Sequence, residues 1–240
     1  MDKKLRRSTD RKTANSVTPG ARPNVANAFG VPSGTDYSCP GATEVCESVC
    51  YAGKLERMYK GVRINATHNF DTINSATGRQ LVKLLDDMIT EFERECEKKN
   101  AEKLFRIHHD GDFFNLRYAN AWVAVMLNHP DVTFWAYTRS FHLVKSFAGI
   151  DNFTLYLSVD NDNVESAIVT YAANSWVKLA ALGKTFDDAK ALLAYMGAKG
   201  ARCPELNGAL PLVDSNGGAC FKCGLCIFGR GNVLFSSSKK

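Results

Sequence analysis

The sequence of 240 residues has no apolar run that approaches the roughly 20 residues of a membrane-spanning helix. It also has no hydrophobic segment behind its polar, basic N-terminus, where a secretory leader would carry one. No glycine-rich phosphate loop of the dinucleotide or Walker type opens a predicted helix. These absences argue against a membrane protein, a secreted protein and an enzyme that uses a nucleotide cofactor of those kinds. We therefore expect a cytoplasmic protein with no membrane partner.

An excess of charge of either sign is missing from most of the chain. The net charge is +5, and residues 1–22 alone hold seven Lys and Arg against two Asp, so the remaining body is neutral. This segment also contains Ser, Thr, Pro and Gly, and such blocks bind phosphates weakly and without sequence preference. We predict a flexible basic arm over residues 1–22, which either solubilises the protein or contacts nucleic acid or another protein. A single domain follows over residues 23–240.

Hydrophobic periodicity in this domain alternates between strand and helix. The predicted strands lie near residues 25–31, 103–109, 132–137, 152–159 and 176–181. The predicted helices lie near residues 79–96, 118–127, 164–172 and 187–196. This alternation requires a parallel sheet, so the fold class is α/β. An open doubly wound sheet and a partial or complete (βα) barrel both fit the order, and we expect the barrel-like arrangement, with a cysteine-rich N-terminal loop and C-terminal tail.

Polar side chains follow three consecutive predicted strands, where ligands gather in parallel α/β folds. The candidates for catalysis or for binding a small molecule are His108, Asp110, Asp112, Arg139 and Asp160. The alternative for each is that a loop begins there and is polar for that reason alone. His108 and Asp110 alternate onto one face of their strand, so with a further histidine they would also suit a mononuclear iron site.

Eight cysteines in a cytoplasmic chain are better interpreted as metal or cluster ligands than as disulfides, because thiols stay reduced there. Cys96 falls on the apolar stripe of the helix near residues 79–96, so we predict a core thiol. The first dense group is SCPGATEVCESVC, with Cys39, Cys46 and Cys50 as the predicted ligands. Three ligands leave one position, which either a C-terminal thiol fills or a small molecule occupies.

The second group combines Cys203, which precedes a proline, with Cys220, Cys223 and Cys226 in a Cys-x2-Cys-x2-Cys run. A triple run of this kind with a distant Cys-Pro is ferredoxin-like. Structural zinc sites more often use two separate Cys-x2-Cys pairs, so zinc is the less favoured alternative to an iron–sulfur cluster. We predict an iron–sulfur cluster, most simply 4Fe-4S. The seven thiols either converge on one centre, as we expect, or serve two.

The stretches CPGATEVCESVCYAG, IHHDGDFFNLRYANAW and VTFWAYTRS, with the cysteine-rich C-terminus, resemble the gene-product-eighty-eight family of phage proteins, typical of actinobacterial viruses. The resemblance covers most of residues 24–229. More distantly, three cysteines in a loop after the first strand are similar to the radical S-adenosylmethionine superfamily, whose partial barrel holds a four-iron cluster. That likeness implies Cys39, Cys46 and Cys50 as cluster ligands. The superfamily's usual Cys-x3-Cys-x2-Cys spacing and its Gly-Gly-Glu-like strand end are absent here.

From these patterns we expect a phage-encoded 4Fe-4S protein of the host cytoplasm, with radical-enzyme-like architecture and redox or radical chemistry on an unidentified substrate. If S-adenosylmethionine binds, the resemblance implies that Asp110, Asp112, Arg139 and Asp160 hold it and the substrate. The alternative is a non-catalytic protein, stabilised by zinc or a cluster, that binds host nucleic acid or a host factor through residues 1–22. The sequence does not decide whether the protein is an enzyme.

Overall fold

A parallel sheet forms the centre of the fold, in a computed structural model that describes residues 4–13, 25–215 and 217–238. Seven strands follow one another in the order β1-β2-β3-β4-β5-β9-β6. They are β1 (Ala28–Gly30), β2 (Leu104–Asp110), β3 (Thr133–Thr138), β4 (Phe153–Val159), β5 (Lys178–Gly183), β6 (Gly200–Arg202) and β9 (Asn232–Ser236). A separate antiparallel pair joins β7 (Val213–Asp214) to β8 (Gly217–Gly218).

The sheet confirms the α/β class, and the five predicted strands coincide with β1 to β5. Two further strands, β6 and β9, were not predicted. Within the described residues β1 and β6 are the edges of the sheet and are not paired with each other, so closure into a complete barrel is not shown.

Eight α-helices and two 3-10 segments connect and cover the strands in the part of the chain that the structure describes. The helices are α1 (Glu44–Val49), α2 (Tyr51–Met58), α3 (Lys60–Ser75), α4 (Gly78–Lys99), α5 (Leu116–Asn128), α6 (Val164–Ala173), α7 (Phe186–Tyr195) and α8 (Ala219–Cys223). The 3-10 segments are η1 (Arg11–Thr13) and η2 (Phe141–Phe147). None of the described helices is both long and apolar enough to cross a bilayer.

Helix α4 shows why the periodicity in the sequence was informative. Its apolar stripe, which includes Leu81, Leu85 and Cys96, is fully buried against the sheet. The predicted core role of Cys96 is therefore confirmed. Thr77 begins the helix with a capping box, and Asn100 ends it in the left-handed conformation at φ 48°.

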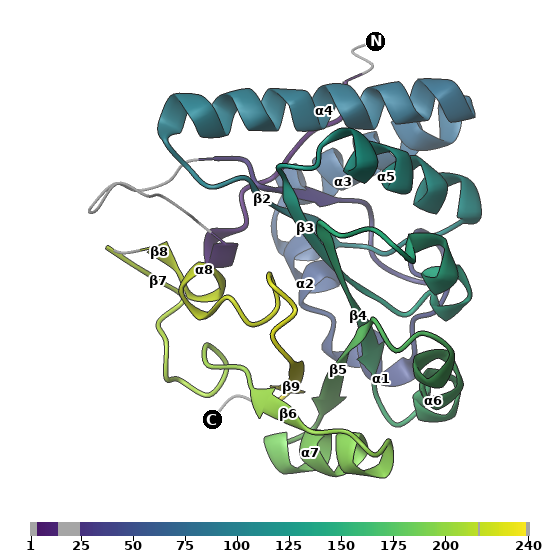
Figure 1. The fold of residues 1–240 in the computed structure, drawn as a ribbon, viewed down its shortest axis with the longest axis vertical. Helices are drawn as coiled ribbons and strands as arrows, with labels where there is room; N and C mark the ends of the chain where they lie inside the picture. The colour runs from purple at the N-terminus through teal and green to yellow at the C-terminus, as the bar shows by residue number, and fades with distance from the viewer. Residues whose placement is uncertain (1–3, 14–24, 216, 239–240) are drawn as a thin grey trace.

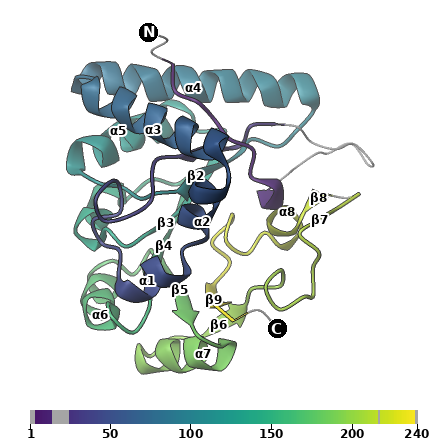
Figure 2. The ribbon, with the colours of Figure 1, turned by 180° about the vertical axis from the view of Figure 1, so that it is seen from behind.

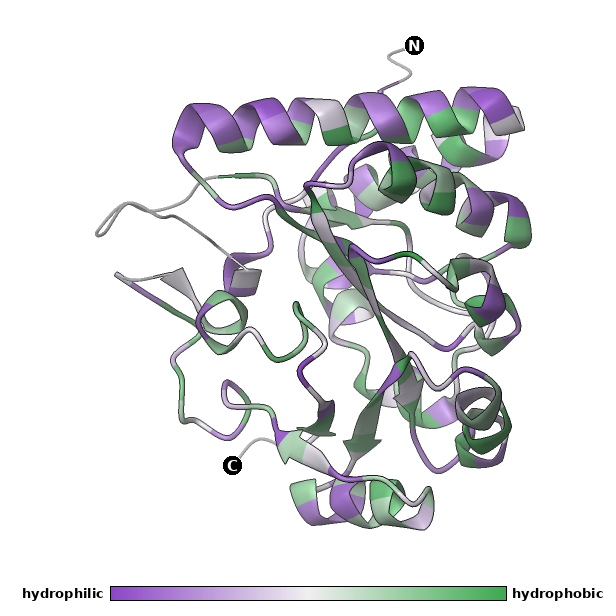
Figure 3. Ribbon diagram, in the orientation of Figure 1, coloured by the Kyte–Doolittle hydropathy of each residue, from purple (hydrophilic) through white to green (hydrophobic). Residues whose placement is uncertain are grey.

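The two faces of the sheet are covered by different parts of the chain. Helices α4 to α7 and η2 bury one face in the main hydrophobic core. The C-terminal segment lies over the other face, where Trp135, Tyr156 and Val233 form two smaller clusters with it. Figures 1 and 2 show this segment (yellow) on the opposite side of the sheet from α5 and α6. In Figure 3 the strands are mainly hydrophobic and α4 alternates between hydrophilic and hydrophobic residues, as expected for a buried sheet under an amphipathic helix.

Residues 4–13 correct the prediction of a free arm, because they pack against the body. Leu5 is buried, and Ser8 forms an antiparallel bridge with Ala28 at the edge of the sheet. Arg7 pairs with Glu95 of α4 at 2.7 Å between Nη1 and Oε2. The rest of the predicted arm, residues 1–3 and 14–22, lies outside the described residues.

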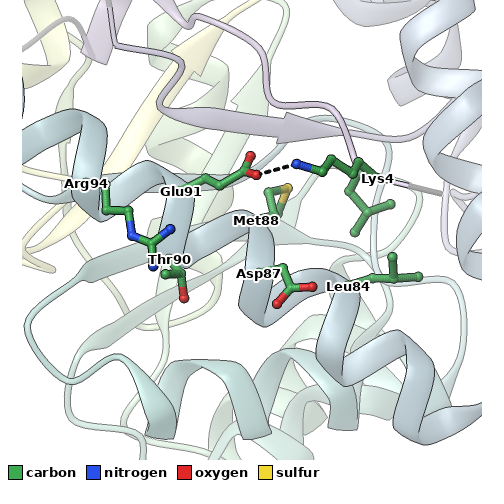
Figure 4. A pocket seen from close by; sticks show the side chains of 8 residues that line it. Lys4, Leu84, Asp87, Met88, Thr90, Glu91 and Arg94 are labelled. Atoms are coloured by element: carbon green, nitrogen blue, oxygen red, sulfur yellow. Dashed lines mark hydrogen bonds and ion pairs between the residues drawn. The ribbon is translucent and has the colours of Figure 1, made fainter. Parts of the chain in front are cut away.

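A shallow pocket lies between this segment and α4 (Figure 4). The Lys4 ammonium reaches the Glu91 carboxylate there, at 2.9 Å. The side chains that line the pocket include none of the predicted site residues. The candidate site residues therefore lie elsewhere in the fold.

Strand β2 contains a local irregularity that changes the direction of its side chains. His108 has a φ of 62°, in the left-handed region, and the register with β1 shifts at this point. Its ring packs 4.5 Å from the Phe113 ring, and its Nε2 lies 2.8 Å from the Tyr118 hydroxyl in the core. This irregularity breaks the simple alternation on which the expected sharing of one face by His108 and Asp110 depends.

Candidate metal or cluster centres

The N-terminal thiol set (Cys39, Cys46 and Cys50) spans the loop before α1, α1 itself and the junction of α1 with α2, a segment held against the C-terminal ends of β3 and β4. Gly41 is pressed onto the end of β3, where a Cβ would come 2.2 Å from the Arg139 carbonyl oxygen. The Thr43 hydroxyl donates to Asp160 at 2.7 Å and accepts the Cys46 N–H at 3.0 Å. Thr43 thus caps α1 and ties the loop to β4 at the same time.

The predicted strand-end residues Asp112, Arg139 and Asp160 form the support for this loop. Asp112 is buried, and its two oxygens accept the Thr138 hydroxyl and the Arg139 backbone N–H, each at 2.7 Å. The Arg139 guanidinium bonds Asp160 at 2.9 Å between Nη2 and Oδ2. Because Asp112 and Asp160 are already hydrogen-bonded within the protein, their visible role is to position the loop.

The three thiols of this set interact with one another and with the strand-end charges. Burial, with a smaller contribution from the nearby Asp112 carboxylate, raises the pKa of Cys39 to about 12. Burial also raises the pKa of Cys46, which Arg139 lowers and the charge of Cys50 raises. The Cys50 sulfur accepts the Gly53 N–H at 3.4 Å, at the beginning of α2. A bound cation would favour the thiolate forms that burial disfavours here.

Asp110 differs from the other candidates, because neither of its carboxylate oxygens has a hydrogen-bond partner among the described residues. It is only 3% exposed. Burial, with a smaller contribution from the charge of Glu56 on α2, raises its pKa to about 8. Glu56 itself accepts both the Ser33 hydroxyl and the Ser33 N–H. Asp110 is thus the buried candidate carboxyl that favours a proton, beside the Glu56 carboxyl.

The C-terminal thiol set (Cys203, Cys220, Cys223 and Cys226) lies on the sheet face that carries Tyr137 and Tyr156. Cys203 directly follows β6, whereas Cys220 and Cys223 belong to α8, and Cys226 follows it. Close packing brings α8 here: a Cβ on Gly218 would come 2.3 Å from the Lys12 carbonyl oxygen of η1. Lys12 also bonds Glu205, next to the Cys203-Pro204 turn, at 2.7 Å.

The four thiols of this set have mutual electrostatic contacts centred on Cys226. Burial raises the pKa of Cys226 to about 11, the Tyr137 hydroxyl lowers it through a hydrogen bond, and Cys203 and Cys223 raise it. Cys220, with a pKa of about 12 through burial, also interacts with Cys226. Burial raises the pKa of Cys203, while the backbone N–H groups of Glu205 and Leu206 lower it through hydrogen bonds. Backbone amides directed at a sulfur are what a bound thiolate needs.

The two sets have different immediate neighbours among the described residues, and the expected convergence of all seven thiols on one centre stays a prediction. A chain of contacts runs between them. Tyr51 directly follows Cys50 in the chain, and its hydroxyl accepts a hydrogen bond from Arg106 Nη2 at 3.1 Å. The Arg106 guanidinium lies 5.6 Å from the centre of the Tyr137 ring, whose hydroxyl bonds Cys226. Arg106 also lowers the pKa of Cys220. The Arg106 guanidinium is itself paired with Asp10, at 2.6 Å between Nη1 and Oδ2.

Single-ion geometry is not present at either set. In residues 4–13, 25–215 and 217–238, no group of three or more His, Cys, Asp or Glu side chains converges closely enough to hold one metal ion. His108 in the core and Asp110 beside Glu56 likewise share no ion site. Arg106, Tyr137 and Glu56 surround the candidate centres but were not predicted, because only the tertiary structure reveals their position.

Comparison with known sequences identifies the family of this chain. A family model described as Gene product 88 matches residues 3–229. The chain belongs to the gene product 88 family. A Gene 88 protein of Mycobacterium phage L5 is 43% identical over 243 residues, which cover 99% of both chains. A Gene 88 protein of Mycobacterium phage D29 is 43% identical over 247 residues, which cover 98% of this chain and 99% of that relative.

The family match confirms the resemblance to gene product 88 and supports the bacteriophage prediction. The more distant similarity to radical S-adenosylmethionine enzymes is not shown by these comparisons. No solved structure matches the chain.

Proposed function

We propose that this protein binds iron–sulfur clusters at two separate centres, one at each thiol set, in the host cytoplasm. The observation that carries the proposal is the assembly of Cys203, Cys220, Cys223 and Cys226 from two distant segments onto one buried face. Four thiols complete the ligands of a 4Fe-4S cluster, which supplies one-electron chemistry. The amides at Cys203 and the Arg106 cation favour the negative charge of such a group.

Zinc remains the alternative metal. A zinc ion and a four-iron cluster require different arrangements of the sulfurs in the C-terminal thiol set. Each thiolate of a four-iron cluster binds a different iron, so the sulfurs stay further apart than around one ion. A tetrahedral zinc site requires four sulfurs at about 2.3 Å from a single point. The ferredoxin-like Cys-x2-Cys-x2-Cys run of Cys220, Cys223 and Cys226 supports the cluster over zinc.

At the N-terminal thiol set, we propose a cluster with one position open to a small molecule, because only three thiols lie there. S-adenosylmethionine is the ligand that the three-cysteine loop suggests. Asp110 supports a ligand at this place through its two unpartnered oxygens. Arg139 supports it through its charge, whereas Asp112 and Asp160 position the loop. The chemistry proposed is redox or radical chemistry on an unidentified substrate.

The test is iron and acid-labile sulfide content after purification without oxygen, with the visible spectrum before and after dithionite. We expect about eight iron atoms per chain, four per cluster. Substituting Cys39, Cys46 and Cys50 by serine is expected to remove half of the iron, and substituting Cys220, Cys223 and Cys226 the other half. Zinc without sulfide would contradict the proposal.

Binding of S-adenosylmethionine has its own measurement. The electron paramagnetic resonance spectrum of the reduced protein is expected to change when the compound is added, and to stay unchanged in the serine variant of the N-terminal set. An unchanged spectrum in the cluster-loaded wild type would remove this ligand while leaving the clusters in place.

The alternative function, a non-catalytic protein that contacts a host factor through residues 1–22, loses part of its support. Residues 4–13 use Arg7 and Lys12 in ion pairs with the body. These charges are therefore not free to bind phosphates as a flexible arm would.

A further inference from the structure

Helices α2 and α3 present one exposed face with a repeated pattern. Positions i, i+3 and i+4 of a helix lie on the same side, and in both helices they hold two cations and a large apolar residue. This α2–α3 face consists of Lys54, Arg57, Met58, Tyr59, Lys60, Arg63 and Ile64. Figure 2 shows α2 and α3 following each other on the side turned to the viewer.

The four cations of the α2–α3 face are not neutralised by the protein. None of them forms an ion pair with any residue that the structure describes. The acid within the same stretch, Glu56, is directed to Ser33. The face therefore keeps a local positive potential on a body whose net charge is neutral.

The apolar residues of the same face are also unpartnered. Met58 is 70% exposed, Tyr59 between the two helices is 54% exposed, and Ile64 is 48% exposed. A helix that lies on a lipid surface separates its cations from its apolar residues. Here the two kinds alternate on one face, as in proteins that bind the backbone of a single nucleic-acid strand and stack its bases.

The face begins beside the N-terminal thiol set. Cys50 caps α2. A Cβ added to Gly53 would lie 3.8 Å from the Cys50 sulfur and 3.4 Å from Arg57 Nη1, so both groups are close to this turn of the helix. Tyr51, the first residue of α2, is 52% exposed. A ligand that follows the cations along α3 and α2 therefore arrives at the thiols.

We propose that the α2–α3 face binds single-stranded nucleic acid, with Lys54, Arg57, Lys60 and Arg63 on its phosphates and Tyr59 against a base. Charge complementarity and the interleaved aromatic ring favour this occupant over an acidic protein, which would match the cations alone. Binding at the face does not depend on a metal. Binding there would bring a nucleic-acid strand to the proposed centre at the N-terminal thiol set. The strand would be either the substrate of that centre or a ligand held beside it.

The test is fluorescence anisotropy of the full chain with a labelled 20-nucleotide DNA strand and the RNA strand of the same sequence, over a range of salt concentrations. The variant K54A/R57A/K60A/R63A is expected to lose more than tenfold in affinity. Because each phosphate contact contributes about 0.7 to the salt slope of a single strand, the slope should fall by up to about 3. Y59A is expected to lose about tenfold for the strands and to keep its affinity for heparin, which has no bases.

The matched control is R79A/K83A/R94A/K98A, which removes four exposed cations from α4. It is expected to keep the wild-type affinity within about threefold, since its cations belong to α4 and not to the α2–α3 face. Absence of strand binding by the wild type at low salt, or equal losses in the two quadruple variants, would overturn the proposal. So would stronger binding to polyglutamate or to phosphatidylserine vesicles than to either strand. Iron and sulfide content, measured on the same samples, reports separately on the clusters.

Discussion

The N-terminal and C-terminal thiol sets use the same side chain in opposite surroundings. Hydrogen bonds hold the N-terminal loop at the polar strand ends, through Thr43, Asp160 and Arg139. Apolar and aromatic packing on the sheet face holds the C-terminal set, through Tyr137 and Tyr156. The difference teaches that four thiols on a closed, apolar face suit a retained cluster, whereas three thiols beside unfilled polar groups suit a site that exchanges a ligand.

The largest expected effect separates the contributions of the two sets to stability. Cys220→Ser with Cys226→Ser is expected to lower the thermal midpoint by about 10 °C or more, because a metal centre there holds the segment that covers the sheet. Cys39→Ser with Cys46→Ser should lower it by much less. Calorimetry of loaded and chelated protein checks this, and equal shifts for the two pairs would contradict the contrast.

Two glycines test how each set is anchored. Gly41→Ala forces a Cβ against the Arg139 carbonyl, and Gly218→Ala forces one against Lys12. Each is expected to cost about 1–3 kcal/mol in the free energy of unfolding by overpacking. Iron content should fall only at the N-terminal set for the first and only at the C-terminal set for the second. Gly61→Ala, which meets no atom within 4 Å, is the control.

The charges beside the two sets predict a pH effect at one of them. The folded pKa of Asp110 is raised to about 8, above the ordinary value of 3.8, so the folded state binds a proton that the unfolded state releases. Stability contributed by this group is therefore present at low pH and is lost as the pH rises from about 4 to about 8. Asp110→Asn should flatten this decline in urea titrations at several pH values. An unchanged pH profile would show that Asp110 is ionised in the folded protein.

The smallest expected effect concerns the tie between the N-terminal loop and β4. Thr43→Val removes the cap of α1 and the hydrogen bond to Asp160, at a cost of about 1–2 kcal/mol in the free energy of unfolding. Thr43→Ser keeps both hydrogen bonds and serves as the control. Chemical denaturation measures the difference in unfolding free energy between the two variants. The surroundings of the C-terminal set, as reported by the fluorescence of Tyr137 and Tyr156, should be the same in both.

Much of the parallel sheet could be predicted from the sequence, and much of its surroundings could not. Strands β2 to β5 and helices α4 to α7 have strong apolar periodicity, because each buries a face in the main core. Helix α3 buries only Ala66, Asn69 and Ile73, so its pattern is mainly polar and it was missed. Strands β6 and β9 were missed because they are short and join the sheet out of chain order.

The candidate site shows the same division between local and distant information. Seven cysteines at close spacing marked both thiol sets, since ligand spacing is a local property of the chain. The bulge at His108, the Arg106 link and the unpartnered Asp110 had no signal in the sequence. Each depends on contacts with residues far along the chain, such as Tyr118, Tyr51 and Glu56.

By itself, the sequence determined the α/β class, the order of the main strands and helices, and the grouping of the thiols, because periodicity and ligand spacing act over a few residues. Only the tertiary structure decided which residues surround each thiol set and that residues 4–13 pack against the body. It also decided that a cationic and apolar face begins at Cys50. Burial, ion pairing and the direction of a side chain are set by neighbours that are distant in the sequence, so they become determined only when the chain folds.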